Sequence, residues 1–294
     1  MKRGLRWVAA GGVALLATYV GIGSVLVAPY RHAQAQPPQY LHAEKVTLPS
    51  RSGATIAAWV IVPETPRAVV VILHGVHADR GTMLGRAELF WREGFAVVIP
   101  DFQAHGESTG EHVTFGFLES RDADACLSYA KHRFPRLPLA GVGVSMGGAA
   151  LALASEKPLL DAVVLEAVYP TIAEAVDNRI ALRLGALSKV LTPLLLLQLE
   201  PRLGINSADL RPIDRVPGFK CPLLIISGGA DRNTTEEQTR ALFEAAPSPK
   251  DLWLVPGAGH VDLLKYDKPG YSQHVLAYLL RTLVQERRSG LTSG

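Results

Sequence analysis

The chain has 294 residues, of which 48% are hydrophobic and 19% charged, so it is long and apolar enough to bury a large core. Its net charge of +3 is small and no basic stripe runs through its middle, which excludes nucleic acid as an expected partner. The two cysteines, Cys126 and Cys221, form no C-x-x-C pair, so neither a zinc site nor a disulfide framework is predicted. We expect two unrelated buried thiols, although an exported domain would also permit a bridge between them.

The N-terminus predicts a membrane anchor over residues 1–28. Three positive charges precede residues 7–28, which carry no charge and, as a helix, would span about 33 Å, enough for a hydrocarbon core of about 30 Å. The positive flank places the rest of the chain on the extracytoplasmic side, as in the periplasm of a bacterium. Residues 33–35 resemble an A-x-A cleavage site, so a secreted protein with a cleaved signal remains the alternative. Residues 29–43 are predicted to be a linker.

The remaining residues, 44–288, predict one α/β domain. Two strand-like segments, 44–48 and 54–62, flank a turn and indicate an opening antiparallel hairpin. Continuous apolar runs follow, which are typical of strands buried on both faces, at 68–73, 95–100, 137–144, 162–165, 223–226 and 252–255. Helical patterns lie between most of these runs, at 81–93, 118–134, 146–156, 235–246 and 270–287. The alternation predicts a mostly parallel, doubly wound sheet.

Residues 171–217 interrupt this alternation and are longer than one crossover needs. Most of 184–199 is apolar. The segment is either a pair of extra helices packed on the core or a helical cap that shapes an apolar acyl site. A second membrane span is disfavoured because Arg183, Lys189, Pro193 and Glu200 leave too short an uninterrupted stretch.

The motif Gly143-Val144-Ser145-Met146-Gly147 points to a nucleophile. The pattern G-x-S-x-G holds a serine on a sharp turn between a strand and a helix, where glycines are needed and the hydroxyl is exposed. About one shuffled sequence in eight would contain this pattern by chance. The residues before and after the motif therefore decide whether it marks a nucleophile. Here a predicted strand precedes Ser145 and a helix of small residues follows it. The context is the one that the motif requires.

A serine hydroxyl needs a base, and the base needs an orienting acid. The chain order in sheets of this kind is Ser, then Asp or Glu, then His. Two histidines follow Ser145, and His260 lies in a glycine-rich loop directly after a strand, whereas His274 falls within the last helix. We therefore predict His260 as the base and His274 as a surface residue.

Asp231 is the predicted acid because it follows the 223–226 strand and precedes His260 in the chain. Other carboxylates also lie at suitable places in the chain. We interpret Glu166 and Asp262 as structural or rim carboxylates, and Asp177 as part of the cap.

An oxyanion requires two backbone N–H donors. Met146 follows the nucleophile directly, and the loop after the 68–73 strand supplies Val76, with His77 as second choice. His74, His77 and Asp79 lack a further ligand at metal-site spacing, so no metal is predicted. His105 precedes the serine in a glycine-rich loop and is interpreted as part of a structural turn at the pocket rim.

On these motifs the chain resembles the α/β-hydrolase superfamily. The likeness rests on Leu73–Val76, Asp101–Gly110, Gly143–Gly148, and Gly229–Asp231 together with Gly259-His260, and it covers about residues 45–287. Within the superfamily the chain is similar to the serine-aminopeptidase-like and dienelactone-hydrolase-like group, which includes membrane-anchored single-domain members. One departure is Ala104, where the family's rim loop has a glycine. The resemblance implies hydrolysis without a cofactor, through an acyl-enzyme intermediate.

The sequence thus predicts a serine hydrolase that cleaves small-molecule carboxylic esters. A thioesterase, an amidase or a peptidase would use the same residues. A catalytically silent, membrane-tethered binding protein is the alternative from another class, although such proteins usually lose a triad member and none is lost here. Neither the acyl length nor the oligomeric state follows from the sequence.

Overall fold

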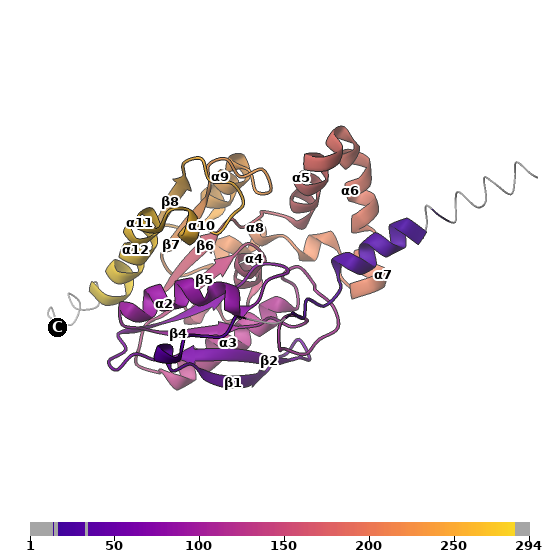
Figure 1. Cartoon of the computed structure of the whole chain (residues 1–294). Helices are drawn as coiled ribbons and strands as arrows, with labels where there is room; N and C mark the ends of the chain where they lie inside the picture. Colours follow the sequence, from indigo (N-terminus) through magenta and orange to yellow (C-terminus); the bar gives the residue numbers. More distant parts are fainter. Residues whose placement is uncertain (1–13, 15–16, 33–34, 286–294) are drawn as a thin grey trace, which may run out of the picture.

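The computed structural model describes residues 14, 17–32 and 35–285 of the chain. Figure 1 shows a central twisted sheet with helices on both of its faces and a helical segment projecting beside the N-terminal helix. The sheet has eight strands, in the order β1-β2-β4-β3-β5-β6-β7-β8. Their bounds are β1 Glu44–Pro49, β2 Thr55–Ile61, β3 Ala68–Leu73, β4 Phe95–Pro100, β5 Leu139–Val144, β6 Ala162–Glu166, β7 Leu223–Gly228 and β8 Lys250–Val255.

The predicted hairpin and the mostly parallel sheet are both confirmed. β1 pairs with β2 and β2 with β4 in antiparallel register, whereas every other neighbouring pair is parallel. The parallel strands are apolar on both faces because helices cover both sides. In β3, for example, Val69 and Val71 face one core cluster and Val70 and Ile72 face the other.

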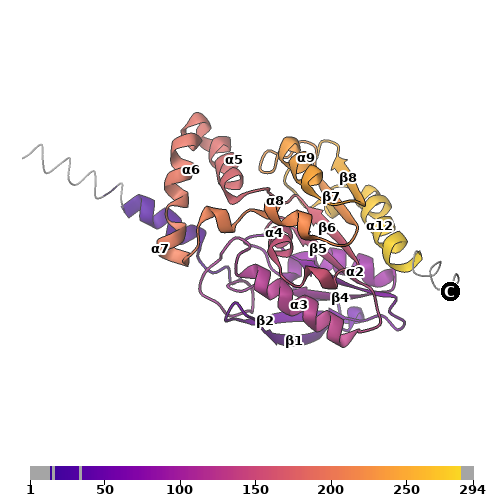
Figure 2. The ribbon, with the colours of Figure 1, turned by 180° about the vertical axis from the view of Figure 1, so that it is seen from behind.

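The two cores are closed by different helices. One contains side chains of α3 (Glu119–Arg133), α4 (Met146–Leu153) and α9 (Glu236–Ala245). The other contains side chains of α2 (Leu84–Arg92) and of the C-terminal helices α10 (Leu263–Tyr266), α11 (Lys268–Tyr271) and α12 (Ala277–Leu280). Figure 2 shows α3 in front of the sheet when the molecule is seen from behind. This layering is the predicted doubly wound arrangement.

The helix predicted over residues 270–287 is present, but its start and its helix type differ from the prediction. The structure has a helical run from Lys268, in which π-helical turns at Ser272–Leu276 and Arg281–Gln285 alternate with α-helical turns. The extra residue in each π turn locally widens the helix, and a sequence period near 3.6 does not reveal it. Residues 286–288, the end of the predicted domain, lie outside the described residues.

The 171–217 segment forms helices that stand apart from the sheet. α5 (Ile172–Leu184) ends at Gly185, whose φ of 55° lies in the left-handed region that glycine favours. α6 (Ser188–Leu196) then returns beside α5 to make a helical hairpin. The short helices α7 (Leu199–Leu203) and α8 (Pro212–Arg215) lead back to β7.

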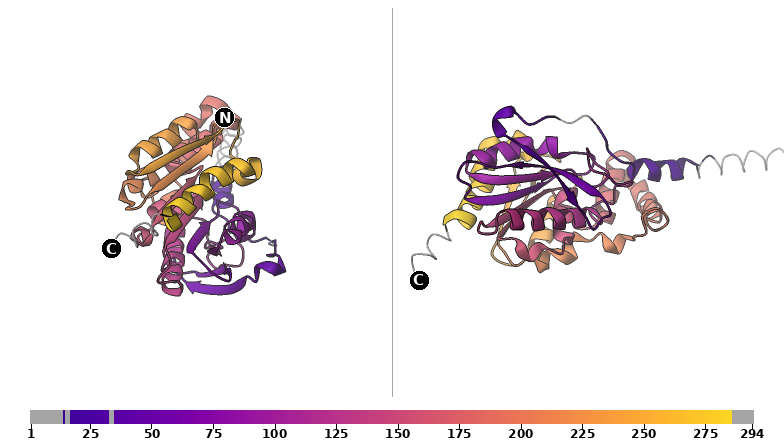
Figure 3. Two further views of the ribbon diagram at one scale, coloured as in Figure 1. Left: turned by 90° about the vertical axis from the view of Figure 1, so that its left-hand side faces the viewer. Right: turned by 90° about the horizontal axis from the view of Figure 1, so that it is seen from below.

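The described part of the predicted anchor is helical over Ala17–Leu26. This helix is tied to the hairpin: the Tyr19 hydroxyl donates to the Leu194 carbonyl at 2.7 Å, and Arg202 Nη1 donates to Ser24 Oγ at 2.9 Å. Figure 3 shows the helix leaving the body of the molecule next to the hairpin. Residues 7–13 and 15–16 of the predicted span, and 33–34 of the predicted cleavage site, lie outside the described residues.

The following linker is packed on the domain at its start. The N–H of Tyr30 donates to Ala104 O at 2.7 Å, and Gly106 N–H donates to Tyr30 O at 2.9 Å. Val113 N–H donates to Val27 O at 2.9 Å. Residues 27–30 therefore lie along the loop that contains Ala104, the position at which the chain departs from the resembled family. Ala104 has a φ of 58°.

Candidate active site

Ser145 occupies the junction between β5 and α4. Its φ of 51° and ψ of −113° lie outside the regions that side chains favour, and such strain is concentrated at functional sites. The turn is held on both sides, because Ser145 N–H donates to Glu166 O at 2.7 Å and Ser145 O accepts the N–H groups of Gly148 and Ala149 at 3.0 Å. The structure therefore places Ser145 on the sharp strand-to-helix turn that the motif predicts, at the carboxyl edge of the sheet.

The glycines of the motif are required by close packing. A Cβ at Gly143 would lie 2.5 Å from Gly148 Cα, and one at Gly147 would clash with the carbonyl oxygen of Leu73 at the end of β3. Because no side chain fits at either position, α4 starts directly against the neighbouring strand. The amino end of α4 is thereby brought beside the loop that follows β3.

That loop contains the predicted oxyanion donors and passes beside Ser145. A Cβ at Gly75 would lie 3.6 Å from Ser145 Cβ. Among the described residues, the backbone N–H groups of Val76 and Met146 have no protein acceptor, so both donors are available. The loop is fixed by His74, whose Nδ1 bonds Gly75 O at 2.7 Å and whose Nε2 accepts Phe102 N–H at 3.0 Å.

Asp231 and His260, from the loops after β7 and β8, are brought into contact. Asp231 Oδ2 lies 2.7 Å from His260 Nδ1, and the Asp231 side chain is fully buried. Asp231 Oδ1 accepts the N–H groups of Asn233 at 2.7 Å and Thr234 at 2.9 Å. These two bonds fix the carboxylate, which in turn orients the imidazole through Nδ1.

Ser145 and His260 lie on the same edge of the sheet but are not joined. In the described part of the chain, no hydrogen bond connects the Ser145 hydroxyl with His260. Catalytic hydrogen bonds are often long without substrate and shorten when it binds. The structure thus contains the Asp231–His260 pair and the Ser145 turn, with no hydrogen bond joining them among the described residues.

The other carboxylates at this edge have separate partners. Glu166, Asp262 and Tyr271 converge on Arg86 of α2: the guanidinium bonds both oxygens of Glu166 and Asp262 Oδ1, and the Tyr271 hydroxyl donates to Glu166. Asp177 bonds Lys189 at 2.6 Å within the hairpin. The interpretation of Glu166 and Asp262 as structural carboxylates agrees with these contacts.

His74, His105 and His274 each contact other parts of the protein. Burial lowers the pKa of His74 to about 3, so it is neutral, consistent with its two backbone bonds. His105 is fully buried and its Nδ1 lies 2.9 Å from Gln103 O. His274 is exposed and stacks on Trp253 with 4.4 Å between ring centroids.

Arg179 of α5 is a neighbour of the site that sequence reasoning missed. Asn178, the preceding residue, donates to Asn233 O and to Gln238 Oε1, which ties α5 to the loop after Asp231. Burial lowers the pKa of Arg179, while the nearby Tyr169 and Asp231 raise it. The spacing of residues 171–180 does not indicate that this guanidinium lies near Asp231. The fold of the hairpin brings the two side chains together.

A small apolar groove of about 50 Å³ lies between the hairpin and the N-terminal helix, a volume well below the usual range of ligand pockets. Ile172 and Val176 of α5 line one side, and Leu26 and Val27 line the other. Phe115 also lines it, and its carbonyl oxygen accepts the hydroxyl of Tyr169, the tyrosine near Arg179. The N-terminal segment thus forms one wall of this groove.

Within the described residues, no group of three or more His, Cys, Asp or Glu side chains is arranged to hold a metal ion. Cys126 and Cys221 are both free and buried. Burial raises the pKa of the Cys221 thiol to about 12, and that of Cys126 further still, so neither has thiolate character at neutral pH.

Comparison with known proteins identifies related chains. A family model described as serine aminopeptidase, S33, matches residues 64–213, which contain Ser145, Val76 and Met146. YqkD of Bacillus subtilis, named as an uncharacterized protein, is 24% identical over 236 residues, which are 79% of this chain and 77% of that protein. A monoglyceride lipase of Rattus norvegicus is 25% identical over 265 residues, which are 76% of this chain and 84% of that protein.

Solved structures share the fold. An esterase of Pyrococcus furiosus superimposes with a TM-score of 0.72 at 21% identity, covering 88% of this chain and 98% of that one. An esterase of Exiguobacterium antarcticum gives a TM-score of 0.59 at 14% identity, covering 80% of this chain and 99% of that one. At these identities the likeness shows the α/β-hydrolase fold, as predicted, and nothing about substrate.

Proposed function

Because this chain belongs to the serine aminopeptidase, S33, family of α/β-hydrolases, we propose that it is a serine hydrolase that cleaves carboxylic esters. The observation that carries the proposal is the contact of 2.7 Å between buried Asp231 and His260, at the sheet edge where Ser145 lies on its strand-to-helix turn. The family label by itself does not select peptides over esters.

The chemistry proceeds in two halves. Ser145 Oγ attacks the acyl carbon while His260 Nε2 takes its proton, and His260 then returns that proton to the leaving alcohol. Asp231 stabilises the imidazolium that forms in between. The N–H groups of Val76 and Met146 donate to the oxyanion of each tetrahedral intermediate. A water deprotonated by His260 finally releases the acid and restores Ser145.

One observation favours an ester over a thioester or an amide: the relative from Rattus norvegicus is named a monoglyceride lipase. The groove beside the hairpin is lined mainly by apolar side chains and suits an apolar acyl group whatever its leaving group, and neither Ser145 nor His260 lines it. The preference is measured with one acyl group presented as an ester, a thioester and an amide.

Active-site labelling tests the mechanism. A fluorophosphonate probe is expected to modify Ser145 and to leave Ser145→Ala unlabelled, while hydrolysis of p-nitrophenyl esters disappears in that variant. Ser128→Ala, on the exposed face of α3, is the matched control and keeps both signals. Esterase activity retained by Ser145→Ala would overturn the mechanism, and a wild-type chain that neither labels nor hydrolyses would favour the silent binding protein.

We also propose that residues 7–28 anchor the chain in a membrane, with the hydrolase domain on the extracytoplasmic side. Support comes from the helix Ala17–Leu26, which is bonded to the hairpin and lines the groove, so cleavage after Ala35 would remove part of the domain's packing. Mass spectrometry of the protein from a membrane fraction tests this. Recovery of peptides from residues 17–32 supports the anchor, whereas a mature N-terminus after Ala35 supports the cleaved signal.

A further inference from the structure

Two segments that are far apart in the sequence present most of the exposed large apolar side chains of the described residues. One is the helix Ala17–Leu26, where Val25 is 72% exposed. The other is the α5–α6 hairpin, where Leu187 and Val190 are each 60% exposed and Leu197 is 68% exposed. Exposed apolar patches of this kind mark contact surfaces for proteins or membranes.

The hairpin is unusually apolar for a segment outside the core. Residues Ile172–Leu203 have a mean hydropathy of 1.7 in their most apolar window, yet only 11% of that window is buried. Length and composition alone would allow this stretch to cross a membrane. The turn at Gly185 instead folds it into two shorter helices that are too short to span.

The two apolar segments are joined by polar contacts. The Tyr19 carbonyl oxygen accepts Gln198 Nε2 at 3.0 Å, and the Val20 carbonyl oxygen accepts Arg202 Nη2 at 2.6 Å. Together with the bond from Tyr19 to Leu194, these contacts hold the helix against the end of α6 and the start of α7. Figure 1 shows the helix crossing the end of the hairpin at this point.

If residues 7–28 span a bilayer, the hydrogen bonds between the N-terminal helix and the end of the hairpin determine how deep the hairpin lies in that bilayer. A span needs about 20 residues, so nearly the whole segment must lie within the hydrocarbon layer and its borders. Tyr19 and Val20, the residues bonded to α6 and α7, lie just past the middle of that segment, about 12–14 Å from its outer end at 1.5 Å per residue. The end of α6 therefore lies at the level of the outer leaflet.

The charged side chains of the hairpin are also compatible with a membrane surface. Between residues 181 and 199 the only charged side chains are Arg183 and Lys189, both basic and both exposed. Lys189 is paired with Asp177, whereas Arg183 has no ion pair among the described residues. Exposed leucines together with a few basic side chains are typical of helices that lie in the interface of a membrane with anionic lipids.

We propose that the tip and outer face of the α5–α6 hairpin, around Leu184, Leu187, Val190 and Leu197, lie in the interface of the bilayer that holds the N-terminal helix. The proposal rests on the proposed anchor and is independent of the esterase chemistry. Its partner is the lipid surface itself. The apolar groove between the helix and the hairpin is then placed at the membrane surface.

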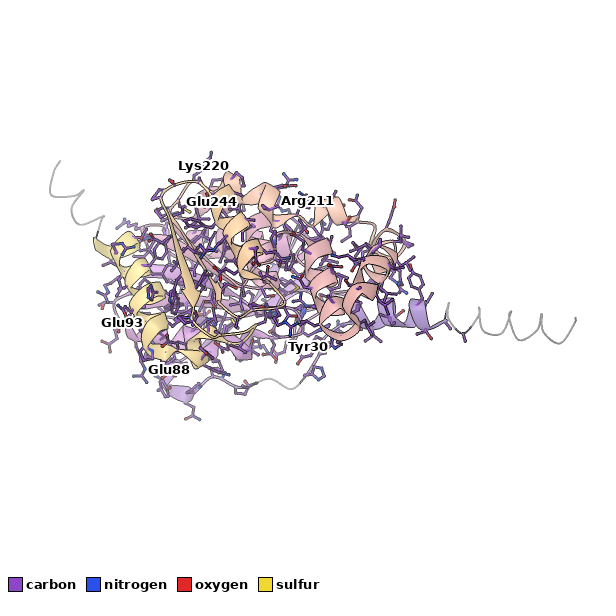
Figure 4. The ribbon with its side chains drawn as sticks, turned by 90° about the horizontal axis from the view of Figure 1, so that it is seen from above. Tyr30, Glu88, Glu93, Arg211, Lys220 and Glu244 are labelled. Carbon is purple, nitrogen blue, oxygen red and sulfur yellow. The ribbon has the colours of Figure 1, made fainter. Side chains whose placement is uncertain are left out.

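Fluorescence at two positions tests this contact in the full-length chain. An environment-sensitive nitrobenzoxadiazole label is attached through Ala186→Cys at the tip of the hairpin, or through Glu244→Cys on α9. Cys126 and Cys221 do not compete because they are buried. Figure 4 shows Glu244 on α9, away from the N-terminal helix. Both proteins are reconstituted in phosphatidylcholine vesicles with or without phosphatidylglycerol and with or without nitroxide-labelled acyl chains.

The expected result is a blue shift and quenching by nitroxide-labelled acyl chains at position 186 but not at position 244. Adding Leu187→Glu to the labelled Ala186→Cys protein is expected to reduce both signals. Equal behaviour of the two labels in chains that float with vesicles would overturn the proposal while leaving the anchor intact. A blue shift at position 186 without quenching by lipid would instead indicate a second copy of the chain and would also overturn it. Fluorophosphonate labelling of the same samples reports the esterase chemistry separately.

Discussion

The guanidinium of Arg86 and the carboxylate of Glu166 form a buried pair with N–O distances of 3.2 and 2.7 Å. The backbone oxygen of Glu166 accepts the N–H of Ser145, and Asp262, two residues after His260, also bonds Arg86. One side chain of α2 therefore supports the loops of the proposed nucleophile and of the proposed base. Within the described part of the chain, Arg86 bonds Glu166 and Asp262 and has no hydrogen bond or ion pair with Ser145 or His260.

We predict that Arg86→Met destabilises the protein by about 3–5 kcal/mol, because it leaves the buried Glu166 carboxylate without its charge partner. Urea unfolding followed by tryptophan fluorescence measures the loss. Arg92→Met on the same helix is the matched control: Arg92 pairs with Glu88 on the exposed surface, so only a small loss is expected. Equal losses in the two variants would show that the buried pair is not important for stability.

Replacing either of two helical glycines by alanine is expected to change the free energy of unfolding, in opposite directions at the two positions. Gly147→Ala forces a Cβ against the Leu73 carbonyl oxygen, and we expect a loss of about 1–3 kcal/mol. In Gly85→Ala the new Cβ lies 3.6 Å from Leu264 Cδ2, an ordinary contact, and helix propensity favours alanine by up to about 1 kcal/mol. Thermal unfolding of both variants measures the two signs. A neutral Gly147→Ala would contradict the packing of α4 against β3.

His74 is expected to make the fold sensitive to acid. Its pKa is lowered to about 3 by burial, whereas an unfolded chain protonates histidine near pH 6.5. Its contribution to stability is therefore fully present above about pH 6.5 and is lost as the pH falls toward 3, by up to about 1.4 kcal/mol per pH unit.

Urea unfolding of His74→Asn between about pH 7.5 and 4.5 tests this, because the asparagine does not titrate there. We expect the unfolding free energy of the wild type to fall more steeply with acid than that of the variant. His274→Asn, at an exposed position, serves as the control and should follow the wild type. Parallel curves for wild type and His74→Asn would refute the assignment of a neutral His74.

Asp231→Asn tests the proposed acid. The amide cannot hold the imidazole in the tautomer that leaves Nε2 free to accept a proton, and the turnover number is expected to fall by about 10⁴-fold. The measurement is hydrolysis of a soluble p-nitrophenyl ester. Asp214→Asn removes an exposed carboxylate that pairs with Arg211, and activity is expected to stay unchanged. Full activity in Asp231→Asn would assign the acid to another carboxylate.

The strands of the sheet could be predicted from the sequence because β3 to β7 are continuous apolar runs whose bounds are set by charged and glycine-rich loops. It also placed Ser145, Asp231 and His260 at strand ends, and parallel topology brings such ends to one edge. The arrangement of Arg86 with Glu166 was not accessible, since the two residues are 80 positions apart and neither lies in a motif.

The helical hairpin shows a second limit of the sequence. Its apolar composition is compatible with a core helix, a cap and a membrane segment alike, and only the left-handed turn at Gly185 decides how the segment folds. The contact of Tyr19 with Leu194 joins residues 175 positions apart. Local patterns carry no information on such a pairing, so the groove that it forms became visible only in the structure.

The wall that Leu26 and Val27 contribute to the groove has a practical consequence for work with this protein. Hydrophobic N-termini are routinely trimmed to obtain material that is easy to purify. Here trimming to residue 29 or beyond deletes that wall and the acceptor of the Val113 N–H. A chain shortened in this way would therefore lack part of this groove, and substrate profiles should be collected on the intact polypeptide.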